Sequence, residues 1–375
     1  MKTAIVHEWL TTFAGSEKVV EEIYEVFPSP IYTLFMDKKM VSQSRLSGAE
    51  IHTSSLQRFP MITKLYRKLL ALFPRKIEEF DLRGYDVVIS SSHSVAKGAL
   101  TDSNQLHISY IHTPVRYAWD LYFRYLEEAG LKRGIKRRYA ERVLHELRKW
   151  DVVSANRVDY FVANSKNIAR RVNKIYRREA EVIYPPVNVK EFALKEAKDN
   201  YYLAASRLVA YKKIDLIAEA FSRMPDKRLV IVGDGPDMKK IKKIAAGHSN
   251  IELLGYRPFP ELRDHMQNAK GFVFAADEDF GIMPVEAQAC GTPVIAYGAG
   301  GALETVVQGA TGLFFDTQTP ESIIDTVKEF ERVEDKWDAK KIRKHAEKFS
   351  TAVFQKNIRE FVEKKYAEFS AKRGR

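Results

Sequence analysis

The sequence contains one cysteine, Cys290, among 375 residues. A single thiol excludes an intrachain disulfide and a cysteine-rich metal cluster. No apolar run approaches the roughly 20 residues that span a bilayer. The first residues also lack the long apolar core and small-residue cleavage site of a signal peptide. These absences predict a soluble protein of the cytoplasm.

The length, the aromatic content and the net charge indicate further what kind of protein this is. At roughly 100–200 residues per domain the length predicts two domains, and 21 Phe, 18 Tyr and 4 Trp argue against disorder. The net charge is +12, with 30 Lys/Arg against 21 Asp/Glu in residues 1–187 and 31 against 28 in the rest. A basic first half favours a polyanion, an anionic membrane surface or a phosphorylated substrate as partner. A solvated surface accounts for the charge equally well.

Short apolar segments alternate with stretches of helical periodicity, such as residues 16–27. The predicted strands are residues 3–7, 31–34, 86–90, 107–112, 160–163 and 182–184 in the first half, and 201–205, 228–232, 251–254, 271–276 and 293–297 in the second. Alternation of this kind predicts parallel sheets covered on both faces. Two such runs predict two Rossmann-like domains of the α/β class.

The domain boundary is predicted at Tyr184-Pro185-Pro186-Val187, because two prolines continue neither a helix nor a strand ladder. We therefore expect domains of residues 1–187 and 188–354. Residues 336–375 are predicted to be helical, with the helix of about 355–375 packing back onto the first domain. Open α/β sheets bind ligands beyond the carboxyl ends of their strands, so two facing sheets predict a cleft lined by loops.

An acidic segment, Asp277-Glu278-Asp279, follows one predicted strand and precedes a helix. The turn Phe280-Gly281-Ile282 can place backbone N–H groups and a helix N-terminus near an anion. Glu286, eight residues after Glu278, suits hydroxyl groups such as those of a ribose. An ordinary helix start, with acidic residues favourable to the helix dipole, accounts for the pattern as well.

Two cations, Arg207 and Lys212, follow the predicted strand at residues 201–205. A guanidinium fork and a compact ammonium together can neutralise a diphosphate. Scattered cations on a surface loop are the ordinary alternative. Gly233-Asp234-Gly235-Pro236 also follows a strand, and there turn chemistry alone explains the proline beside a helix start.

Two weaker signals lie in the first half. His112 ends the predicted strand at residues 107–112 and can donate a hydrogen bond to a hydroxyl or a phosphate. A lone histidine is more often a structural residue. Gly15 precedes a helix and allows close approach of the backbone to a ligand.

Together these elements resemble the retaining glycosyltransferases of family 4, which have the GT-B fold. The resemblance runs through nearly the whole chain and is strongest over residues 201–315. Four motifs carry it: Ser206-Arg207-Leu208 with Lys212, Gly233-Asp234-Gly235-Pro236, Glu278 with Glu286, and Gly291-Thr292-Pro293-Val294-Ile295-Ala296. Gly300-Gly301, Glu304 and Gly312 follow in the family's order.

The resemblance implies a role for each matching residue. Arg207 and Lys212 would hold the donor diphosphate, Glu278 would contact the donor sugar, and Glu286 would bind the ribose. The nucleotide would lie mainly in the second domain and the acceptor in the first, where His112 would contact the sugar. The implied catalytic residues are Glu278, His112, Arg207 and Lys212; the implied donor-binding residues are Gly15, Arg207, Lys212, Gly233, Tyr256, Arg257, Phe280, Gly281, Ile282 and Glu286.

Two features depart from the family pattern. Ala14-Gly15 stands where many members have paired glycines, so the shape of that loop is open. Asp277-Glu278-Asp279 also resembles the Asp-x-Asp metal motif of the other large glycosyltransferase fold. Because Arg207 and Lys212 already supply positive charge, no metal and no cofactor is expected.

The subgroup most similar over residues 277–286 consists of mannosyltransferases that use GDP-mannose. The expected function is retaining transfer of a hexose, mannose from GDP-mannose, to a glycan or lipid-linked acceptor in lipopolysaccharide or other glycan assembly. The acceptor oxygen would attack on the leaving group's side, with the leaving phosphate as base. The alternatives are a UDP-sugar-dependent glycosyltransferase, a nucleotide-sugar epimerase and a basic nucleic-acid-binding protein, although no segment resembles a nucleic-acid module.

Two basic segments bear on the acceptor. Residues 131–149 contain eight Lys/Arg against Glu141 and Glu146, and residues 64–76 mix cations with leucines and aromatics. Both have the character of interfacial helices. They favour a lipid-linked acceptor and peripheral contact with an anionic membrane at its cytoplasmic face. A charged, solvated helix face is the alternative.

Overall fold

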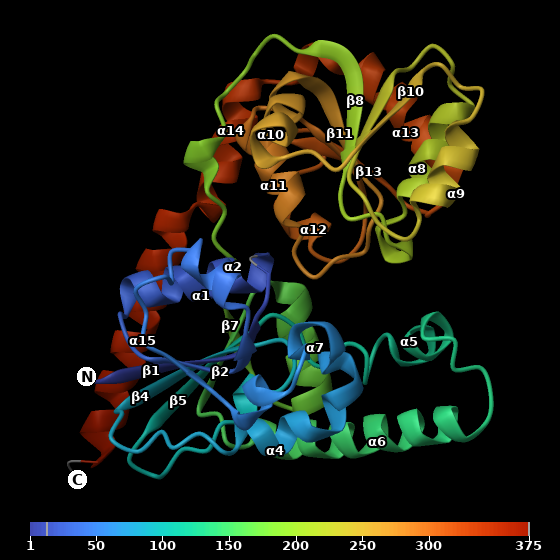
Figure 1. Cartoon of the computed structure of the whole chain (residues 1–375). Coiled ribbons are helices and arrows are strands. Elements are labelled where there is room, and N and C mark those ends of the chain that lie inside the picture. The colour runs from blue at the N-terminus through green and yellow to red at the C-terminus, as the bar shows by residue number, and fades with distance from the viewer. Residues whose placement is uncertain (13, 374–375) are drawn as a thin grey trace. The chain divides into compact units, whose positions relative to one another are not determined.

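The computed structural model describes residues 1–12 and 14–373, and the chain divides into two compact units (Figure 1). Unit 1 comprises Met1–Pro186 and the chain from Phe354 onward, and unit 2 comprises Val187–Val353. Each unit holds one all-parallel sheet, of seven strands in unit 1 and six in unit 2. The predicted architecture of two Rossmann-like α/β domains is confirmed. Residues 374 and 375, the end of the predicted last helix, lie outside the described residues.

Unit 1 has the strand order β3-β2-β1-β4-β5-β6-β7. Its strands are β1 (Thr3–Leu10), β2 (Ile31–Met36), β3 (Ile51–Thr53), β4 (Val87–Ser92), β5 (Leu106–Ile111), β6 (Tyr160–Ala163) and β7 (Ala180–Val182). Its helices are α1 (Gly15–Val26), α2 (Lys38–Ser42), α3 (Ile62–Leu65), α4 (Phe73–Ile77), α5 (Tyr122–Glu128), α6 (Ile135–Ala155), α7 (Lys166–Tyr176) and most of α15 (Thr351–Arg373). The order runs outward in opposite directions from β1 and β4, which makes that pair the topological switch point.

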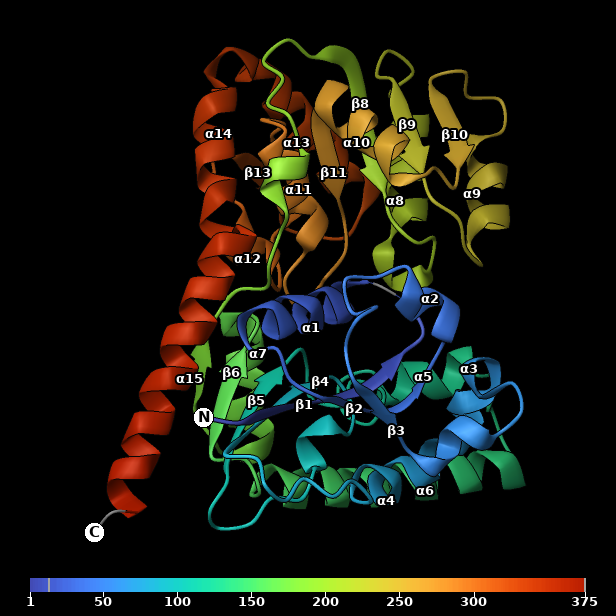
Figure 2. The same ribbon diagram turned by 60° about the vertical axis from the view of Figure 1, so that its left-hand side comes forward.

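Successive residues of β1 face two different cores, as the alternation of side chains along a strand requires. Ile5 packs with α1 and α15, whereas Ala4 and Val6 pack with α4 and α6. Figures 1 and 2 show α1 and α15 against one face of the sheet and α4 and α6 against the other. Burial on both faces explains why the strands are apolar throughout rather than alternating in polarity.

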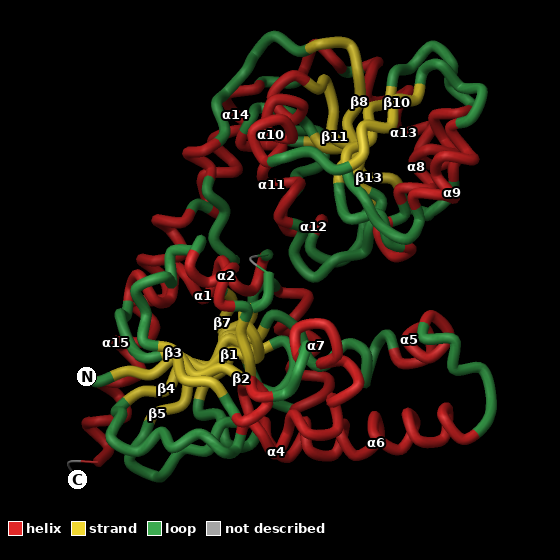
Figure 3. Tube along the Cα trace, in the orientation of Figure 1, coloured by secondary structure: helices red, strands yellow, loops and turns green. Residues whose placement is uncertain are grey.

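Unit 2 has the strand order β10-β9-β8-β11-β12-β13, with its switch point between β8 and β11 (Figure 3). Its strands are β8 (Asp199–Ala205), β9 (Leu229–Val232), β10 (Ile251–Gly255), β11 (Ala269–Phe274), β12 (Val294–Tyr297) and β13 (Gly312–Phe315). Its helices are α8 (Ile214–Ser222), α9 (Met238–Ala245), α10 (Phe259–Asn268), α11 (Ile282–Ala289), α12 (Ala302–Thr305), α13 (Pro320–Arg332) and α14 (Ala339–Ala346). Helices α8 and α13 share a buried apolar core with the sheet.

Two strands were not predicted, and both are short edge strands: β3 and β13. The predicted strand at residues 182–184 lies two residues earlier, as β7. The prediction of continuous helix over residues 336–375 was wrong, because α14 and α15 are separated near Ser350. There Val187 N donates to Phe349 O at 2.9 Å and Thr351 N donates to Val187 O at 3.2 Å. This pairing with a distant residue interrupts the helix without a local glycine or proline.

Residues 64–76, predicted to have the character of an interfacial helix, do not form one continuous helix. The segment folds as α3, a 3₁₀ helix (Tyr66–Leu72) and α4. Phe73 is buried, and Tyr66 and Leu69 pack against the same core. Much of the apolar surface that predicted a membrane contact therefore stabilises unit 1. Among the described helices, none is both long and apolar enough to cross a bilayer.

Replacing Ile358 with alanine tests the packing of α15 on unit 1. Ile358 is fully buried in the core shared with α1 and β1. We expect Ile358→Ala to lower the free energy of unfolding by about 2–5 kcal/mol, through lost burial and the cavity left behind. Denaturant unfolding followed by tryptophan fluorescence measures this, since Trp9, Trp119 and Trp150 lie in unit 1.

The matched control is Lys364→Ala, at an exposed position of the same helix, where a change within about 0.5 kcal/mol is expected. Equal effects of the two substitutions would contradict the docking of α15.

Candidate active site

The predicted donor-binding residues of unit 2 lie in loops at the carboxyl ends of its strands. Arg207 and Lys212 follow β8, Gly233 follows β9, Tyr256 and Arg257 follow β10, and Glu278, Phe280, Gly281, Ile282 and Glu286 follow β11. Parallel pairing puts these loops at one edge of the sheet, where open α/β sheets bind ligands. The described structure thus places separate stretches of sequence on a common surface of unit 2.

The Lys212 ammonium forms an ion pair with the Glu278 carboxylate. Both side chains are 17% exposed, so the pair is partly shielded from water yet open to a ligand. Arg207, in the same loop as Lys212, is exposed. The Lys212–Glu278 pair therefore lies at the switch point between β8 and β11, with the exposed Arg207 in the same loop as Lys212, and this combination of charges suits a ligand with both anionic and hydroxyl groups.

Gly300 and Gly301 fix the acidic loop, a role that sequence reasoning did not assign. Gly301 N donates to Glu278 O at 2.8 Å. A Cβ on Gly301 would overlap the backbone of Phe280, and one on Gly300 would overlap Glu278 O. The order of the two glycines in the family motif was the available signal. Only the structure shows that they let two backbones touch and so hold Glu278 in place.

Gly233 and Gly235 allow a similar close approach to the loop that carries Arg207. Their φ angles are +142° and +159°. A Cβ on Gly233 would overlap Ser206 O, and one on Gly235 would overlap Leu208 O. Leu208 N donates to Asp234 O at 2.9 Å. The Gly-Asp-Gly motif therefore braces the loop after β8, beyond the turn chemistry expected of it.

Gly281 ends the acidic loop with a φ of +84° and precedes α11, which begins at Ile282. Phe280 is buried and packs against Phe349, with ring centroids 5.5 Å apart. This anchor fixes the chain where it enters the helix, and the first backbone N–H groups of α11 are available to an anion. Glu286 lies on the second turn of α11 and is half-buried.

Tyr256 and Arg257 form the outer part of this edge. Tyr256 is 72% exposed, and Arg257 Nε lies 3.3 Å from Glu261 Oε2. An aromatic ring that projects into solvent beside a guanidinium presents a flat surface on which a planar base can stack.

In unit 1 the structure places Gly15 at the first position of α1. The helix start is organised by Glu17, whose Oε2 accepts from Ala14 N at 3.2 Å and Ser16 Oγ at 2.9 Å. His112 follows β5, and its Nε2 lies 2.8 Å from Ser91 Oγ. His112 N also donates to Ser92 O at 2.8 Å, so the residue is held between β4 and β5.

A buried carboxylate next to His112 was missed by sequence reasoning. Glu8, near the end of β1, accepts at Oε1 from Ser92 Oγ and from the backbone N–H groups of three residues, at 2.8–3.0 Å. Those donors belong to His93, Ser94 and Ala96. The other oxygen, Oε2, lies 3.0 Å from His93 Nδ1. A carboxylate at the end of an otherwise apolar strand was the available signal.

Three imidazoles surround this carboxylate. The ring centroid of His93 lies 5.7 Å from that of His7 and 6.2 Å from that of His112. His7 Nδ1 lies 2.9 Å from Ser91 O; because a carbonyl only accepts, this nitrogen carries the proton. Sequence reasoning identified His112 alone, and the structure shows it as one member of a cluster.

The buried groups have shifted pKa values. Burial raises the pKa of Glu8, but the ion pair with His93 and the hydrogen bonds to its carboxylate outweigh this and hold the pKa well below its usual range. Glu8 in turn raises the pKa of His93 against the cost of burial. Burial, with His93 and His7 nearby, holds the pKa of His112 well below its usual value. The cluster therefore combines a Glu8–His93 ion pair with a neutral His112.

Among the described residues, His7, Glu8 and His93 are the group whose ligand atoms lie within 4.8 Å of one another, a spacing that one metal ion could bridge. Glu8 Oε1 has four donors and His7 Nδ1 is bonded to Ser91 O, whereas His7 Nε2, Glu8 Oε2 and His93 Nδ1 are buried without a hydrogen-bond partner among the described residues. In unit 2 the acidic loop has a counter-ion of its own in Lys212.

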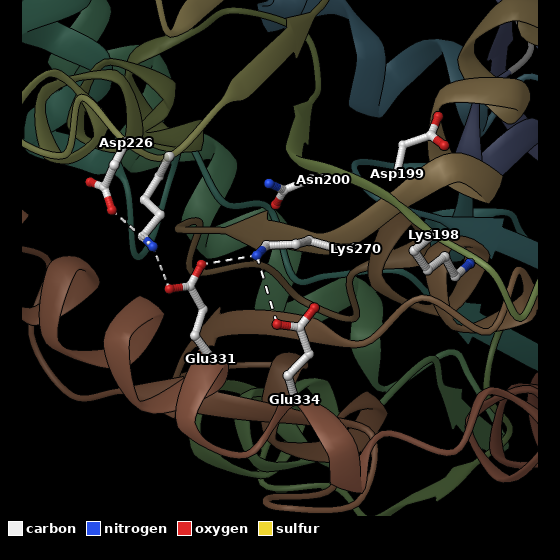
Figure 4. A pocket seen from close by; sticks show the side chains of 8 residues that line it. Lys198, Asp199, Asn200, Asp226, Lys270, Glu331 and Glu334 are labelled. Carbon is white, nitrogen blue, oxygen red and sulfur yellow. Dashed lines mark hydrogen bonds and ion pairs between the residues drawn. The ribbon is translucent and has the colours of Figure 1, made fainter.

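A pocket of about 390 Å³ lies at the opposite edge of the unit 2 sheet, around the starts of β8 and β11 (Figure 4). Two of its lysines are ion-paired: Lys270 Nζ lies 2.9 Å from Glu331, and Lys227 Nζ lies 2.6 Å from the same carboxylate. Lys198 donates instead to two backbone carbonyls and to Thr292 Oγ1. The pocket is thus away from the ligand-binding edge.

Comparison with known families follows this division of the chain. Residues 39–191 match the model described as Glycosyltransferase Family 4, and residues 188–349 match the model described as Glycosyl transferases group 1. Both models describe glycosyltransferases, and between them they cover residues 39–349. The family resemblance predicted from the motifs is confirmed.

Curated relatives match part of the chain. An uncharacterized glycosyltransferase of Methanocaldococcus jannaschii is 32% identical over 174 residues, 46% of this chain and 49% of that protein. A GDP-mannose-dependent alpha-(1-6)-phosphatidylinositol monomannoside mannosyltransferase of Mycolicibacterium smegmatis is 34% identical over 137 residues, 32% of this chain and 36% of that protein. The chain spans about half the length of the first of these relatives and about a third of the second.

Solved structures match over the whole chain. HepE of Anabaena in complex with UDP has a TM-score of 0.73 at 17% identity, covering 97% of this chain and all of that one. Sucrose-phosphate synthase of Thermosynechococcus elongatus has a TM-score of 0.74 at 15% identity, covering 98% of this chain and all of that one. At these identities the likeness establishes the GT-B fold.

Replacing Glu8 with glutamine tests the buried ion pair. Glu8 stabilises the fold above its unfolded pKa of about 4.5, and this contribution is lost as pH falls toward its lower folded pKa. His93 contributes fully below its unfolded pKa of about 6.5 and loses this as pH rises through its higher folded pKa. Between the two unfolded pKa values, the free energy of unfolding of Glu8→Gln, measured with denaturant, should be about 3–5 kcal/mol lower than that of the wild type, because one partner of a buried pair is removed.

The deficit should shrink toward pH 3. Glu25→Gln removes an exposed partner of Arg45 and serves as control, with an expected change of about 0–1 kcal/mol. A pH-independent deficit in Glu8→Gln would contradict the ion pair.

Proposed function

We propose that this protein is a retaining glycosyltransferase that moves mannose from GDP-mannose to a glycan or lipid-linked acceptor in cell-surface polysaccharide or other glycan assembly. The observation that carries the proposal is the Lys212–Glu278 ion pair at the carboxyl edge of the unit 2 sheet, with Arg207 exposed in the loop that carries Lys212. Cations serve the diphosphate of a nucleotide sugar, and a carboxylate serves the hydroxyl groups of the hexose.

The donor assignment is supported by the match to the Mycolicibacterium mannosyltransferase and by a second match to a mannosyltransferase of Corynebacterium glutamicum, both of which are GDP-mannose-dependent by name. The HepE structure contains UDP, and UDP-glucose in another complex. A UDP-sugar donor is therefore the second candidate. Both place a nucleoside diphosphate on unit 2, and they differ in the base and in the hexose.

In the proposed mechanism, unit 2 stabilises charge on the leaving diphosphate. Arg207, Lys212 and the N-terminus of α11 would neutralise it as the glycosidic C–O bond breaks. Glu278, which Gly301 holds in position, would bind hexose hydroxyls, and Glu286 would bind the ribose. The acceptor oxygen would attack from the leaving group's side and pass its proton to the departing phosphate, so that the configuration is retained.

Unit 1 presents a surface suited to a lipid-linked acceptor. The starts of α5 and α6 carry three exposed large side chains: Phe123 at 74%, Ile135 at 86% and Tyr139 at 62% exposure. Six cations share this region: Lys132, Arg133, Lys136, Arg137, Arg138 and Arg142. Exposed apolar groups flanked by positive charge are typical of surfaces that bind anionic lipid interfaces. Figure 1 shows the loop between α5 and α6 extending away from the unit 1 sheet.

Thermal unfolding with GDP, UDP, ADP, GDP-mannose and UDP-glucose at equal concentration tests the donor. A ligand present at about 100 times its dissociation constant adds roughly 2.7 kcal/mol to the stability of the unit that binds it. We expect a shift in the unfolding temperature with GDP and GDP-mannose. A response to uridine ligands alone would favour the second candidate, and no response to any nucleotide would overturn the proposal.

Variants locate the binding site in the same assay. Arg207→Ala should lose most of the GDP shift and lower turnover by about 10²–10³, since it removes charge stabilisation. Arg223→Ala removes another exposed arginine of unit 2, one that pairs with Glu219 and Glu321, and should keep the full shift.

Cosedimentation with anionic and neutral liposomes tests the membrane contact. We expect binding to anionic vesicles, weakened by Ile135→Glu because the substitution removes an apolar contact and adds a repulsive charge. Val153→Glu is the matched control, since Val153 is 58% exposed near the other end of α6. Equal weakening by both variants, or no preference for anionic vesicles, would remove the membrane hypothesis.

A further inference from the structure

The carboxyl ends of β1 and β4 carry a carboxylate–imidazole pair, Glu8 and His93, that the proposed donor chemistry does not use. These two strands form the switch point of the unit 1 sheet, which is where open α/β sheets bind ligands. The pair was not indicated by the family motifs. Its position matches that of the Lys212–Glu278 pair at the switch point of unit 2.

Several hydrogen bonds hold the Glu8 carboxylate in addition to packing. Its Oε1 accepts four hydrogen bonds from the loop that carries His93, including one from His93 N itself at 3.0 Å. The carboxylate thus fixes the backbone of His93, while Oε2 lies 3.0 Å from Nδ1 of its ring. One buried carboxylate therefore holds the backbone of His93 by a hydrogen bond and lies at ion-pair distance from its ring.

The His93 side chain is partly exposed. Glu8 is fully buried, whereas the His93 side chain is 23% exposed although its Nδ1 is buried. Because Nδ1 lies next to Glu8, Nε2 is the ring nitrogen that remains for a ligand. An imidazole with one nitrogen beside a carboxylate and the other left for a ligand is the arrangement by which proteins aim an imidazole at a substrate.

The surroundings of His93 suit a sugar. His112 lies beside it, with ring centroids 6.2 Å apart, and Trp9 packs edge-on at 4.7 Å. Two imidazoles at this spacing can reach different hydroxyl groups of one hexose, and the half-buried Trp9 adds an apolar surface. A simple anion site is less suitable, because the charge of Glu8 offsets that of His93.

We propose that the Glu8–His93 pair, together with His112, forms a hydroxyl-binding element of a hexose subsite in unit 1, in which His93 Nε2 contacts the sugar. This inference rests on the proposed function, since the hexose is that of the donor or of the acceptor. His93 is then a substrate-contacting residue and Glu8 a positioning residue. A hydroxyl both donates and accepts, so it can bond to Nε2 in either protonation state of the ring.

Hydrolysis of the donor tests the role of His93 without an identified acceptor, because water takes the place of the acceptor. The assay measures GDP released from GDP-mannose, with UDP from UDP-glucose in parallel. We expect His93→Phe, which keeps the ring shape and removes both nitrogens, to reduce kcat/KM about 10- to 100-fold, and His93→Gln to recover part of the loss. His52→Phe is the matched control: His52 is 43% exposed, lies in unit 1 and is 2.9 Å from Glu50.

Histidine-ring NMR of the full chain supplies a readout that does not depend on turnover. The signal of His93 is identified by its disappearance in His93→Gln. We expect it to shift with GDP-mannose or with methyl α-mannoside and to stay in place with GDP. A shift with GDP-mannose alone assigns the subsite to the donor hexose, and a shift with the free mannoside as well assigns it to a hexose independent of the nucleotide.

The same spectra test the positioning role of Glu8. The groups that set the titration of His93 are Glu8 and His7 from β1, His112 after β5 and Glu17 on α1. Glu8→Gln removes the nearest anion, so His93 should lose its proton at lower pH than in the wild type.

The outcomes separate the two proposals. Unchanged hydrolysis in His93→Phe, with a His93 signal indifferent to every sugar, would overturn the subsite and leave the glycosyltransferase assignment standing. Absence of any nucleotide binding or hydrolysis by the wild type would overturn the proposed function, and this inference with it.

Discussion

Parallel pairing of the strands is the constraint on which both candidate sites depend. It brings the loops after β8, β9, β10 and β11 to one edge of unit 2, and the ends of β1, β4 and β5 to one edge of unit 1. Each sheet reverses its order between two central strands, and each reversal carries a carboxylate facing a cation. The repetition of this arrangement in two units of different sequence follows from topology.

Close backbone contact is the second requirement, and glycines provide it. Gly301 lets the loop after β12 touch the backbone of Phe280, and Gly233 lets the loop after β9 touch that of Ser206. Through these contacts, neighbouring loops of the sheet hold the segments that carry Glu278 and Arg207. In unit 1 a carboxylate serves the same purpose, since Glu8 gathers the chain after β4 by accepting its N–H groups. Loops that carry charged side chains are thereby held in place.

Much of unit 2's site was accessible from sequence because its motifs are local. Arg207 and Lys212 share one loop, and Glu278 and Glu286 share one loop-helix segment, so short motifs that resemble those of the family indicate them. The Glu8–His93 pair was not accessible, because its members lie 85 positions apart and meet only through strand pairing. The apolar side chains of residues 64–76 raise a related point: amphipathic character does not reveal whether an apolar side meets a membrane or, as for Phe73, a protein core.

The sequence by itself determined the class of the fold, the number of sheets and the motifs of the family, because apolar strands, helical periodicity and glycine turns are encoded over short stretches. Tertiary structure alone decided which charges face one another, where the last helix breaks, and that His112 belongs to a cluster. The break at Ser350 depends on hydrogen bonds with Val187, and the cluster depends on the register of β1 against β4. Such contacts arise between segments distant in the chain, and no local pattern specifies them.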